Sequence, residues 1–183
     1  MLCVGHASAQ GALVHKGSKS LSIGLGFKTS WDEYGDKIKM PPLSASLDFG
    51  VADNVTIGPY VAVSSTSGEG YGDFVDTQTG NISSAYYTYT YSHKLVGLRG
   101  TYNLPVSDKL SAYAGAMLGY HFAKVKYTHS TLQNATIKDA KGNELLYNFF
   151  IAGKYALSPN ASAFAELGYG VTFLNIGVAI KLK

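Results

Sequence analysis

The segment NASAFAELGYGVTFLNIGVAIKLK, which runs from Asn160 to Lys183, alternates apolar residues with polar or small ones over most of its length. Its second half carries one continuous apolar row: Leu174, Ile176, Val178, Ile180 and Leu182. The residues between them are Asn175, Gly177, Ala179 and Lys181. Because successive side chains of a strand point to opposite faces, this pattern predicts strands with one face in apolar surroundings and the other in polar surroundings.

The same alternation recurs along almost the whole chain and predicts eight strands. Six are expected at about residues 19–30, 43–51, 55–65, 84–104, 110–127 and 144–157, with two more within 160–183. Longer polar segments, 31–42, 66–82 and 128–143, follow the first, third and fifth strands, and short turns follow the second, fourth and sixth. An even number of strands with short turns at one end and long loops at the other is typical of transmembrane barrels. We therefore predict an all-β fold, an eight-stranded antiparallel up-and-down transmembrane β-barrel whose first and last strands pair.

Composition agrees with a protein made of strands and turns. Charged residues make up 15% of the 183 residues, against about a quarter in an average soluble domain, and there are 21 Gly and 14 Tyr. The net charge is +3 and the lysines are scattered, so no stripe for nucleic acid is expected. The sequence contains no run of about 18 apolar residues, so no membrane-spanning helix is expected. The rival fold is a soluble lipocalin-like barrel, in which the apolar rows would face inward.

The first ten residues, MLCVGHASAQ, carry an Ala-x-Ala motif at Ala7–Ala9, directly before Gln10. This motif is typical of a signal-peptidase cleavage site. We expect residues 1–9 to be a truncated signal-peptide remnant and residues 10–183 to form a single barrel domain; a native polar arm is the alternative. Cys3 is the only cysteine and falls in the remnant, so no internal disulfide or thiolate site is expected.

Two irregularities stand out in the predicted strands. Pro59 lies within the third strand, where a ladder tolerates it only at a bulge or a local disruption. In the fourth strand Tyr87, Tyr89 and Tyr91 occupy odd positions, whereas Val96 and Leu98 begin an apolar row at even positions. A one-residue bulge near His93-Lys94 would place both rows on the same face.

Aromatic residues gather towards the predicted strand ends. They are Trp31, Tyr86, Tyr87, Tyr89, Tyr91, Tyr120, Tyr127 and Tyr147. Girdles of amphipathic aromatic residues lie at both membrane interfaces of transmembrane barrels, which favours that role here. The alternative is a binding surface on which these rings stack against sugars or another ligand.

The Ala-x-Ala-Gln start, the short turn Val51-Ala52-Asp53-Asn54 and the closing AELGYG and LNIGVAIKLK segments resemble small outer-membrane β-barrel proteins of the OmpX/OmpA type, within the porin-like barrels. The resemblance covers about residues 17–183. It implies a place in the outer membrane of a Gram-negative bacterium and contact with its lipid and lipopolysaccharide. Surface partners would meet loops 31–42, 66–82 and 128–143, and no nucleic acid is implied. Members of the family commonly end on an aromatic residue, whereas this sequence ends Leu182-Lys183.

If the apolar rows face lipid, the opposite rows face the lumen. Those rows carry Lys28, Asp48, Tyr60, Arg99, Lys154, Glu166 and Lys181. Unpaired charges are costly in a narrow lumen, so we expect these groups to pair, with Lys181 opposite Glu166 in the last hairpin. A polar plug is the favoured role, and a gate or constriction is the alternative. The excess of basic residues would favour anions in any residual permeation.

The sequence predicts no catalytic, cofactor or metal site. The histidines, His6, His15, His93, His121 and His129, lack the spacing of a zinc site. His129-Ser130 resembles the His/Ser pair of lipid A deacylases, but a hydrolase also needs an orienting acid and an oxyanion hole. Three hypotheses follow: a non-enzymatic structural or surface-interaction protein, which is favoured, a narrow pore for small solutes or ions, and a lipid-modifying barrel enzyme.

Overall fold

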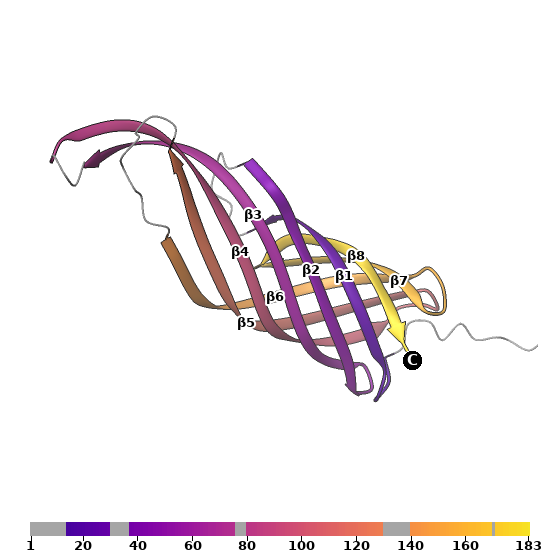
Figure 1. Ribbon diagram of the computed structural model, residues 1–183. Helices are drawn as coiled ribbons and strands as arrows, with labels where there is room; N and C mark the ends of the chain where they lie inside the picture. Colours follow the sequence, from indigo (N-terminus) through magenta and orange to yellow (C-terminus); the bar gives the residue numbers. More distant parts are fainter. Residues whose placement is uncertain (1–13, 30–36, 76–79, 130–139, 170) are drawn as a thin grey trace, which may run out of the picture.

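The computed structural model describes residues 14–29, 37–75, 80–129, 140–169 and 171–183. They form one closed barrel of eight antiparallel strands in which each strand pairs with its neighbours in sequence and β1 pairs with β8 (Figure 1). The strands are β1 (Lys19–Thr29), β2 (Lys37–Ala52), β3 (Val55–Val75), β4 (Ile82–Pro105), β5 (Leu110–His129), β6 (Ala140–Ala156), β7 (Ala161–Tyr169) and β8 (Thr172–Leu182). The predicted eight-stranded barrel and its closure through the last segment are confirmed.

The outer wall of the barrel is apolar. Ile23, Leu118 and Ile151 are each more than half exposed. On each of their strands, further exposed apolar side chains lie at alternate positions on the same face. The inner rows carry buried polar and charged groups instead, among them Asp48 and Arg99. This distribution is inverted relative to a soluble barrel, and it fits strands whose outer face meets lipid. The lipocalin-like alternative, with apolar rows inward, is therefore wrong.

The part of the chain that the structure describes has no helix long and apolar enough to cross a membrane.

The barrel closes along a tight seam between β1 and β8. The two strands pair from Lys19↔Leu182 to Thr29↔Thr172. At the middle of the seam Gly24 faces Gly177, and a Cβ atom on Gly177 would overlap the carbonyl oxygen of Ile23. Glycine therefore permits the close approach of the two backbones here.

One hairpin is much longer than predicted. β3 and β4 pair without interruption from Val55↔Tyr102 to Val75↔Ile82, and their outer parts project beyond the other strands (Figure 1). We call residues 66–75 and 82–91 the β3–β4 ribbon. Most of the predicted loop 66–82 is thus strand. Gly68, Gly70 and Gly72 alternate along it, opposite the Tyr and Thr residues of β4, and a tyrosine ring covers one of them, with Tyr87 atoms 2.6 Å from where a Cβ of Gly70 would lie.

The other two predicted loops are also shorter than expected. β2 begins at Lys37, inside the predicted loop 31–42. β5 continues to His129 and β6 begins at Ala140, inside the predicted loop 128–143. Residues 30–36, 76–79 and 130–139 lie outside the described residues, as do residues 1–13 with the expected signal remnant.

The predicted bulge near His93-Lys94 is wrong. β4 and β5 stay in one register from Tyr87↔His129 to Pro105↔Ser111, so the odd-numbered tyrosines share the inner face with His93 and Arg99. The outer face of β4 turns polar beyond Lys94, where it leaves the apolar wall. The change of phase in the sequence therefore marks a change of surroundings and not an extra residue.

Two further irregularities bear on the predictions made from the sequence. Lys28 has a φ of 53°, and it is exposed while the next residue, Thr29, is buried. This local kink turns Lys28 away from the lumen and corrects its predicted position. Around Pro59 the β2–β3 register is unchanged between Ser46↔Tyr60 and Phe49↔Ile57, but the two residue pairs between them are missing. This local disruption is expected because proline has no backbone N–H to donate to the ladder.

Candidate functional site

A buried network of charges fills the middle of the lumen. The Arg99 Nη2 atom donates to Glu166 Oε1 at 2.7 Å, and its Nε lies 3.6 Å from Asp48 Oδ1. The three side chains come from β4, β7 and β2 and are at most 9% exposed. Only closure of the barrel brings them together, because inward rows of strands distant in sequence meet across a narrow lumen.

Neutral side chains also hydrogen-bond to the two carboxylates. The Tyr113 hydroxyl donates to Glu166 Oε1 at 2.7 Å, and Asn175 Nδ2 donates to Glu166 Oε2 at 3.1 Å. The Ser46 hydroxyl donates to Asp48 Oδ2 at 3.1 Å. Both carboxylates thus accept bonds from polar groups as well as facing Arg99, which offsets part of the loss of water. Asp48 Oδ1 and Arg99 Nε, 3.6 Å apart, have no hydrogen-bond partner among the described residues.

Aromatic rings hold the two basic groups of the network. The Arg99 guanidinium carbon lies 4.6 Å from the Phe150 ring centroid and 5.8 Å from that of Tyr60. The half-buried Lys154 places its Nζ 5.1 Å from the Tyr113 ring centroid. Counted with Lys154, the central layer holds two acidic and two basic groups, so its formal charge is zero.

The structure brings together most, but not all, of the predicted lumen residues. Asp48, Arg99, Glu166 and Tyr60 meet directly, and Lys154 lies beside the same layer. Lys28 is turned outwards, as described above. Lys181 is exposed near the end of β8, and the residue paired with Glu166 is Asn175, so the expected Lys181–Glu166 opposition is wrong. Lys181 instead lines a cavity beside Lys154 at the short-turn end of the lumen, so a basic group remains there, away from Glu166.

Sequence reasoning did not single out Tyr113, Asn175 or Phe150. All three lie on the inward row of their strands, so the alternation that placed Arg99 could also have placed them. These three residues are uncharged, however, so nothing in the sequence distinguished them from other inward residues. The alternation also does not show which inward residues of different strands lie at the same height in the barrel.

An apolar plug lies between the charged layer and the long-loop end. Val171, in the short β7–β8 turn, is 1% exposed and packs in one cluster with Leu95 and Met117, together with Tyr60 and Ala62. Leu146 packs against this cluster from β6. The connection between β7 and β8 is short, unlike the other connections at this end of the barrel, and it places the Val171 side chain inside the barrel.

Two small cavities flank the Arg99–Glu166 pair. One of about 10 Å³ is lined by Arg99, Met117 and Asn148, and one of about 50 Å³, towards the short turns, is lined by Ser111, Lys154 and Lys181. The first has the volume of about one water molecule at most. The two cavities have no lining residue in common.

A pair of histidines lies at the mouth beyond the plug. A hydrogen bond of 3.0 Å joins His93 Nδ1 to His121 Nε2, and another of 3.0 Å joins His121 Nδ1 to Glu144 Oε1. The two rings stack, with centroids 5.1 Å apart. Ser64 faces His93 across the β3–β4 ladder, but its buried hydroxyl has no hydrogen-bond partner among the described residues. The arrangement therefore lacks the bond between nucleophile and base that a Ser–His hydrolase uses.

No group of three or more His, Cys, Asp or Glu side chains in the described ranges is arranged to hold a metal ion. The His129-Ser130 pair considered from the sequence lies outside the residues whose side chains are described.

The tyrosines at the strand ends divide into two groups. Tyr120 and Tyr147 are exposed on the outer wall, at positions that suit a membrane girdle. Tyr87, Tyr89 and Tyr91 instead form a ladder on the inner face of the β3–β4 ribbon, with successive centroids 6.3 and 5.3 Å apart, which ends stacked on His93 at 6.0 Å.

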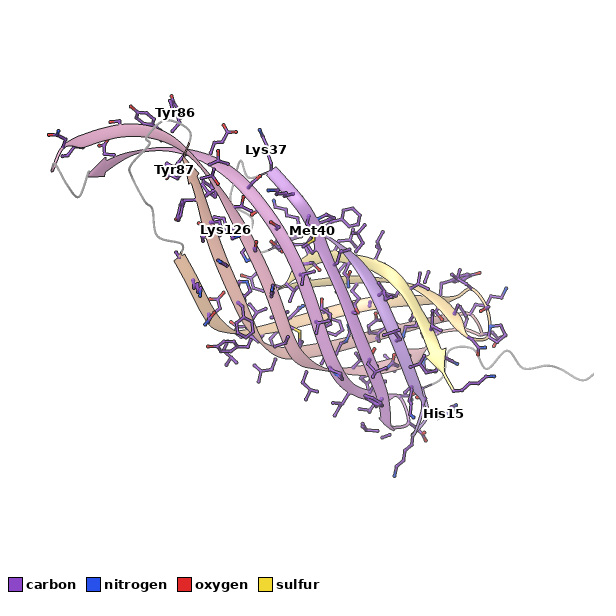
Figure 2. All side chains as sticks on the ribbon, viewed as in Figure 1. His15, Lys37, Met40, Tyr86, Tyr87 and Lys126 are labelled. Carbon is purple, nitrogen blue, oxygen red and sulfur yellow. The ribbon has the colours of Figure 1, made fainter. Side chains whose placement is uncertain are left out.

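Two further aromatic contacts extend this pattern. Tyr127 joins the ladder from β5, 5.9 Å from Tyr87. Tyr86 projects from the opposite face of the ribbon to Tyr87 (Figure 2) and lies 4.7 Å from Tyr71. Trp31 lies outside the described residues.

Comparisons with known proteins agree with the architecture. The chain matches no protein-family model and no curated protein sequence. Its structure is similar to a major outer membrane protein from Thermus thermophilus, with a TM-score of 0.61 and 16% identity over 92% of this chain and 100% of the other. It is also similar to the N-terminal β-barrel domain of Pseudomonas aeruginosa OprF, with a TM-score of 0.52 and 15% identity over 91% of this chain and 98% of that domain. The chain thus has the fold of the small eight-stranded outer-membrane β-barrels.

Proposed function

We propose that this chain is a non-enzymatic outer-membrane protein of a Gram-negative bacterium whose closed barrel anchors the β3–β4 ribbon at the cell surface. In barrels of this class the short turns face the periplasm and the longer loops face the outside. The turns around Asp53, Asp108 and Pro159 would then be periplasmic, and the ribbon extracellular. The ribbon is the part that would meet surface partners.

The observation that carries this proposal is the contrast between a filled lumen and a projecting ribbon. Arg99, Glu166 and the Val171 plug occupy the inside of the barrel, so the lumen offers little to a solute. The ribbon, in contrast, exposes aromatic side chains well beyond the barrel, with Tyr71 and Tyr86 61% and 66% exposed. Tyrosine supplies a large, rigid contact area with a polar tip, and it is enriched where proteins bind one another.

The orientation can be tested by labelling intact cells. In a Cys3→Ser background, Tyr86→Cys on the ribbon should react with a membrane-impermeant maleimide. The control Asp108→Cys, in a short turn, should react only after the outer membrane is permeabilised. Labelling of Asp108→Cys but not Tyr86→Cys on intact cells would overturn the proposed orientation, and recovery of the protein in the soluble fraction would overturn the membrane location.

A narrow pore is the second candidate, and the two cavities on either side of the Arg99–Glu166 pair are the observation in its favour. A continuous path would require this 2.7 Å ion pair to separate and Val171 to move. We expect a flat current trace for the purified barrel in planar lipid bilayers. Reproducible conductance steps that change in Arg99→Gln would instead establish the pore.

The lipid-modifying enzyme is the remaining alternative. Mass spectra of lipid A from cells with and without the gene should be identical if the barrel is non-enzymatic. A species that disappears with the gene, and is not restored by a Ser130→Ala copy, would identify the His129-Ser130 pair as an active site.

A further inference from the structure

The cavity of about 50 Å³ at the short-turn end of the lumen is basic and rich in hydroxyl groups. It lies towards the end of the barrel at which β8 finishes (Figure 1). The side chains in its lining that can donate a hydrogen bond to an anion include Lys19, Lys154, Lys181, Ser20, Ser111 and Ser162. No Asp or Glu is among the described residues that line it. We call this space the basal cavity.

The strand register brings ammonium and hydroxyl groups together around the basal cavity. Ser111 of β5 pairs directly with Lys154 of β6, and Ser20 of β1 pairs directly with Lys181 of β8. The Cβ atoms of such a pair lie about 4.5–5.5 Å apart, so each lysine stem begins beside a hydroxyl group. Ser162 of β7, 9% exposed, joins the lining between these two pairs. Donors from five strands therefore face one small space.

The buried carboxylates of the charged layer face Arg99 and do not line the basal cavity. Glu166 accepts a bond from Arg99 at 2.7 Å, and Asp48 Oδ1 lies 3.6 Å from Arg99 Nε. Within the described ranges Lys154 forms no ion pair, and its Nζ lies 5.1 Å from the Tyr113 ring centroid. A half-buried ammonium group without a paired carboxylate is costly, and an anion in the adjoining cavity would lower that cost.

The basal cavity has the size of a small polyatomic ion. A single water molecule needs about 10–15 Å³ on the same scale, so about 50 Å³ holds a few water molecules or one ion of similar bulk. Hydroxyl groups from three strands give the lining several directions of donation. A tetrahedral oxyanion, whose four oxygen atoms point in different directions, can use more of these donors than a planar carboxylate or a halide ion can.

We propose that the basal cavity is a binding site for a tetrahedral divalent oxyanion, hydrogen phosphate or sulfate. Lys154 is its direct cationic ligand, since lysine binds phosphate-like groups as a point charge. Ser111, 2% exposed, donates its hydroxyl proton to an oxygen of the ion. Lys181 adds positive charge to the same lining, which favours a divalent over a monovalent anion because Coulomb attraction scales with charge.

The test is an NMR titration of the folded barrel, in neutral detergent, with its alanine methyl groups labelled. Sodium phosphate and sodium sulfate are added separately, at constant ionic strength, to a buffer that contains neither ion. Ala156 and Ala179 line the basal cavity, whereas Ala116 is exposed on the outer wall. We expect saturable shifts of the Ala156 and Ala179 signals and none of the Ala116 signal. Shifts that never saturate, or that are equal at Ala116, would overturn the proposal.

Three variants assign the binding to named groups. Lys154→Gln removes the direct cation, and its matched control, Lys109→Gln, removes the same charge from an exposed position in a short turn outside the lining. A hydrogen bond to a charged group contributes roughly 10- to 100-fold in affinity, so Lys154→Gln should bind more weakly by that factor and Lys109→Gln as well as the wild type. Ser111→Ala, which leaves the charge unchanged, should bind about tenfold more weakly. Equal affinities of Lys154→Gln and Lys109→Gln would contradict the assigned site.

Further anions establish which ion the cavity prefers. Binding of phosphate, of sulfate or of both supports the site and identifies its ion, whereas binding of neither overturns it. Acetate and chloride should bind about tenfold more weakly because they carry one charge, and equal affinity for them would refute the preference for a divalent oxyanion. Heat-modifiable gel migration reports folding of each variant. The purified barrel binds the ion whichever way it faces in the membrane, so the outcome is independent of the proposed orientation and of the ribbon.

Discussion

Removal of Arg99 is the most direct test of the buried network. Arg99→Met keeps much of the side-chain volume against Phe150 but leaves Asp48 and Glu166 without their shared cation. Breaking a buried pair by removing one partner costs about 3–5 kcal/mol, because the remaining charge is buried and uncompensated. We therefore expect Arg99→Met to lower the free energy of unfolding by about 3–5 kcal/mol, a large part of the total for a small protein.

The matched control is Tyr113→Phe, which removes one 2.7 Å hydrogen bond to Glu166 and leaves the ion pair in place. Loss of a single bond of this kind should cost about 1–2 kcal/mol. Adding Glu166→Gln to Arg99→Met should restore part of the loss, since only Asp48 then remains as an unpaired carboxylate.

The assay is reversible guanidinium unfolding in lipid vesicles, followed by circular dichroism and by heat-modifiable migration. An Arg99→Met barrel as stable as Tyr113→Phe would refute the view that Arg99 compensates two buried charges. A double variant less stable than Arg99→Met alone would refute the assignment of the cost to the carboxylates.

Three further predictions concern the wall, the seam and the plug. Leu118→Arg, in the lipid-facing row, should lower stability by about 2–4 kcal/mol, whereas Thr128→Arg, beyond the wall, should cost less than about 1 kcal/mol; equal costs would contradict the assigned membrane level. Gly177→Ala should cost about 1–3 kcal/mol because its Cβ would overlap the β1 backbone, while Gly153→Ala, which has open space, should leave the unfolding midpoint unchanged. Val171→Ser should cost about 2 kcal/mol by placing a hydroxyl in the apolar plug, and an unchanged midpoint would show that the plug contributes little.

The fold could be predicted from the sequence because lipid imposes a strict period of two on the outer rows. Leu174 to Leu182 and Leu21 to Phe27 keep that period, and both strands lie where the pattern placed them. The same rule failed beyond the membrane, where nothing requires the outer face of β4 to be apolar. Tyr87, Tyr89 and Tyr91 lie there on the inner face of the strand. We had expected aromatic residues on the outer face, so the sequence wrongly predicted a bulge at the point where the outer face becomes polar.

The charged network could be predicted only in part. Inward alternation selected Asp48, Arg99 and Glu166, but the level at which each lies depends on the stagger between strands that are far apart in sequence. Lys181 shares a hairpin with Glu166, yet it lies six residues beyond the position that faces it, Asn175. A backbone irregularity that no residue type announces removed Lys28 from the lumen.

Unequal strand lengths give the barrel a high side and a low side. β3 and β4 have 21 and 24 residues, whereas β7 and β8 have 9 and 11. In a crowded membrane, a neighbouring protein with a large external domain fits beside β7 and β8. Beside β3 and β4 the projecting hairpin excludes such a domain. The tall hairpin also makes the surroundings of the buried His93 unequal, because among the described residues β3 and β4 extend beyond the other strands on one side of the barrel.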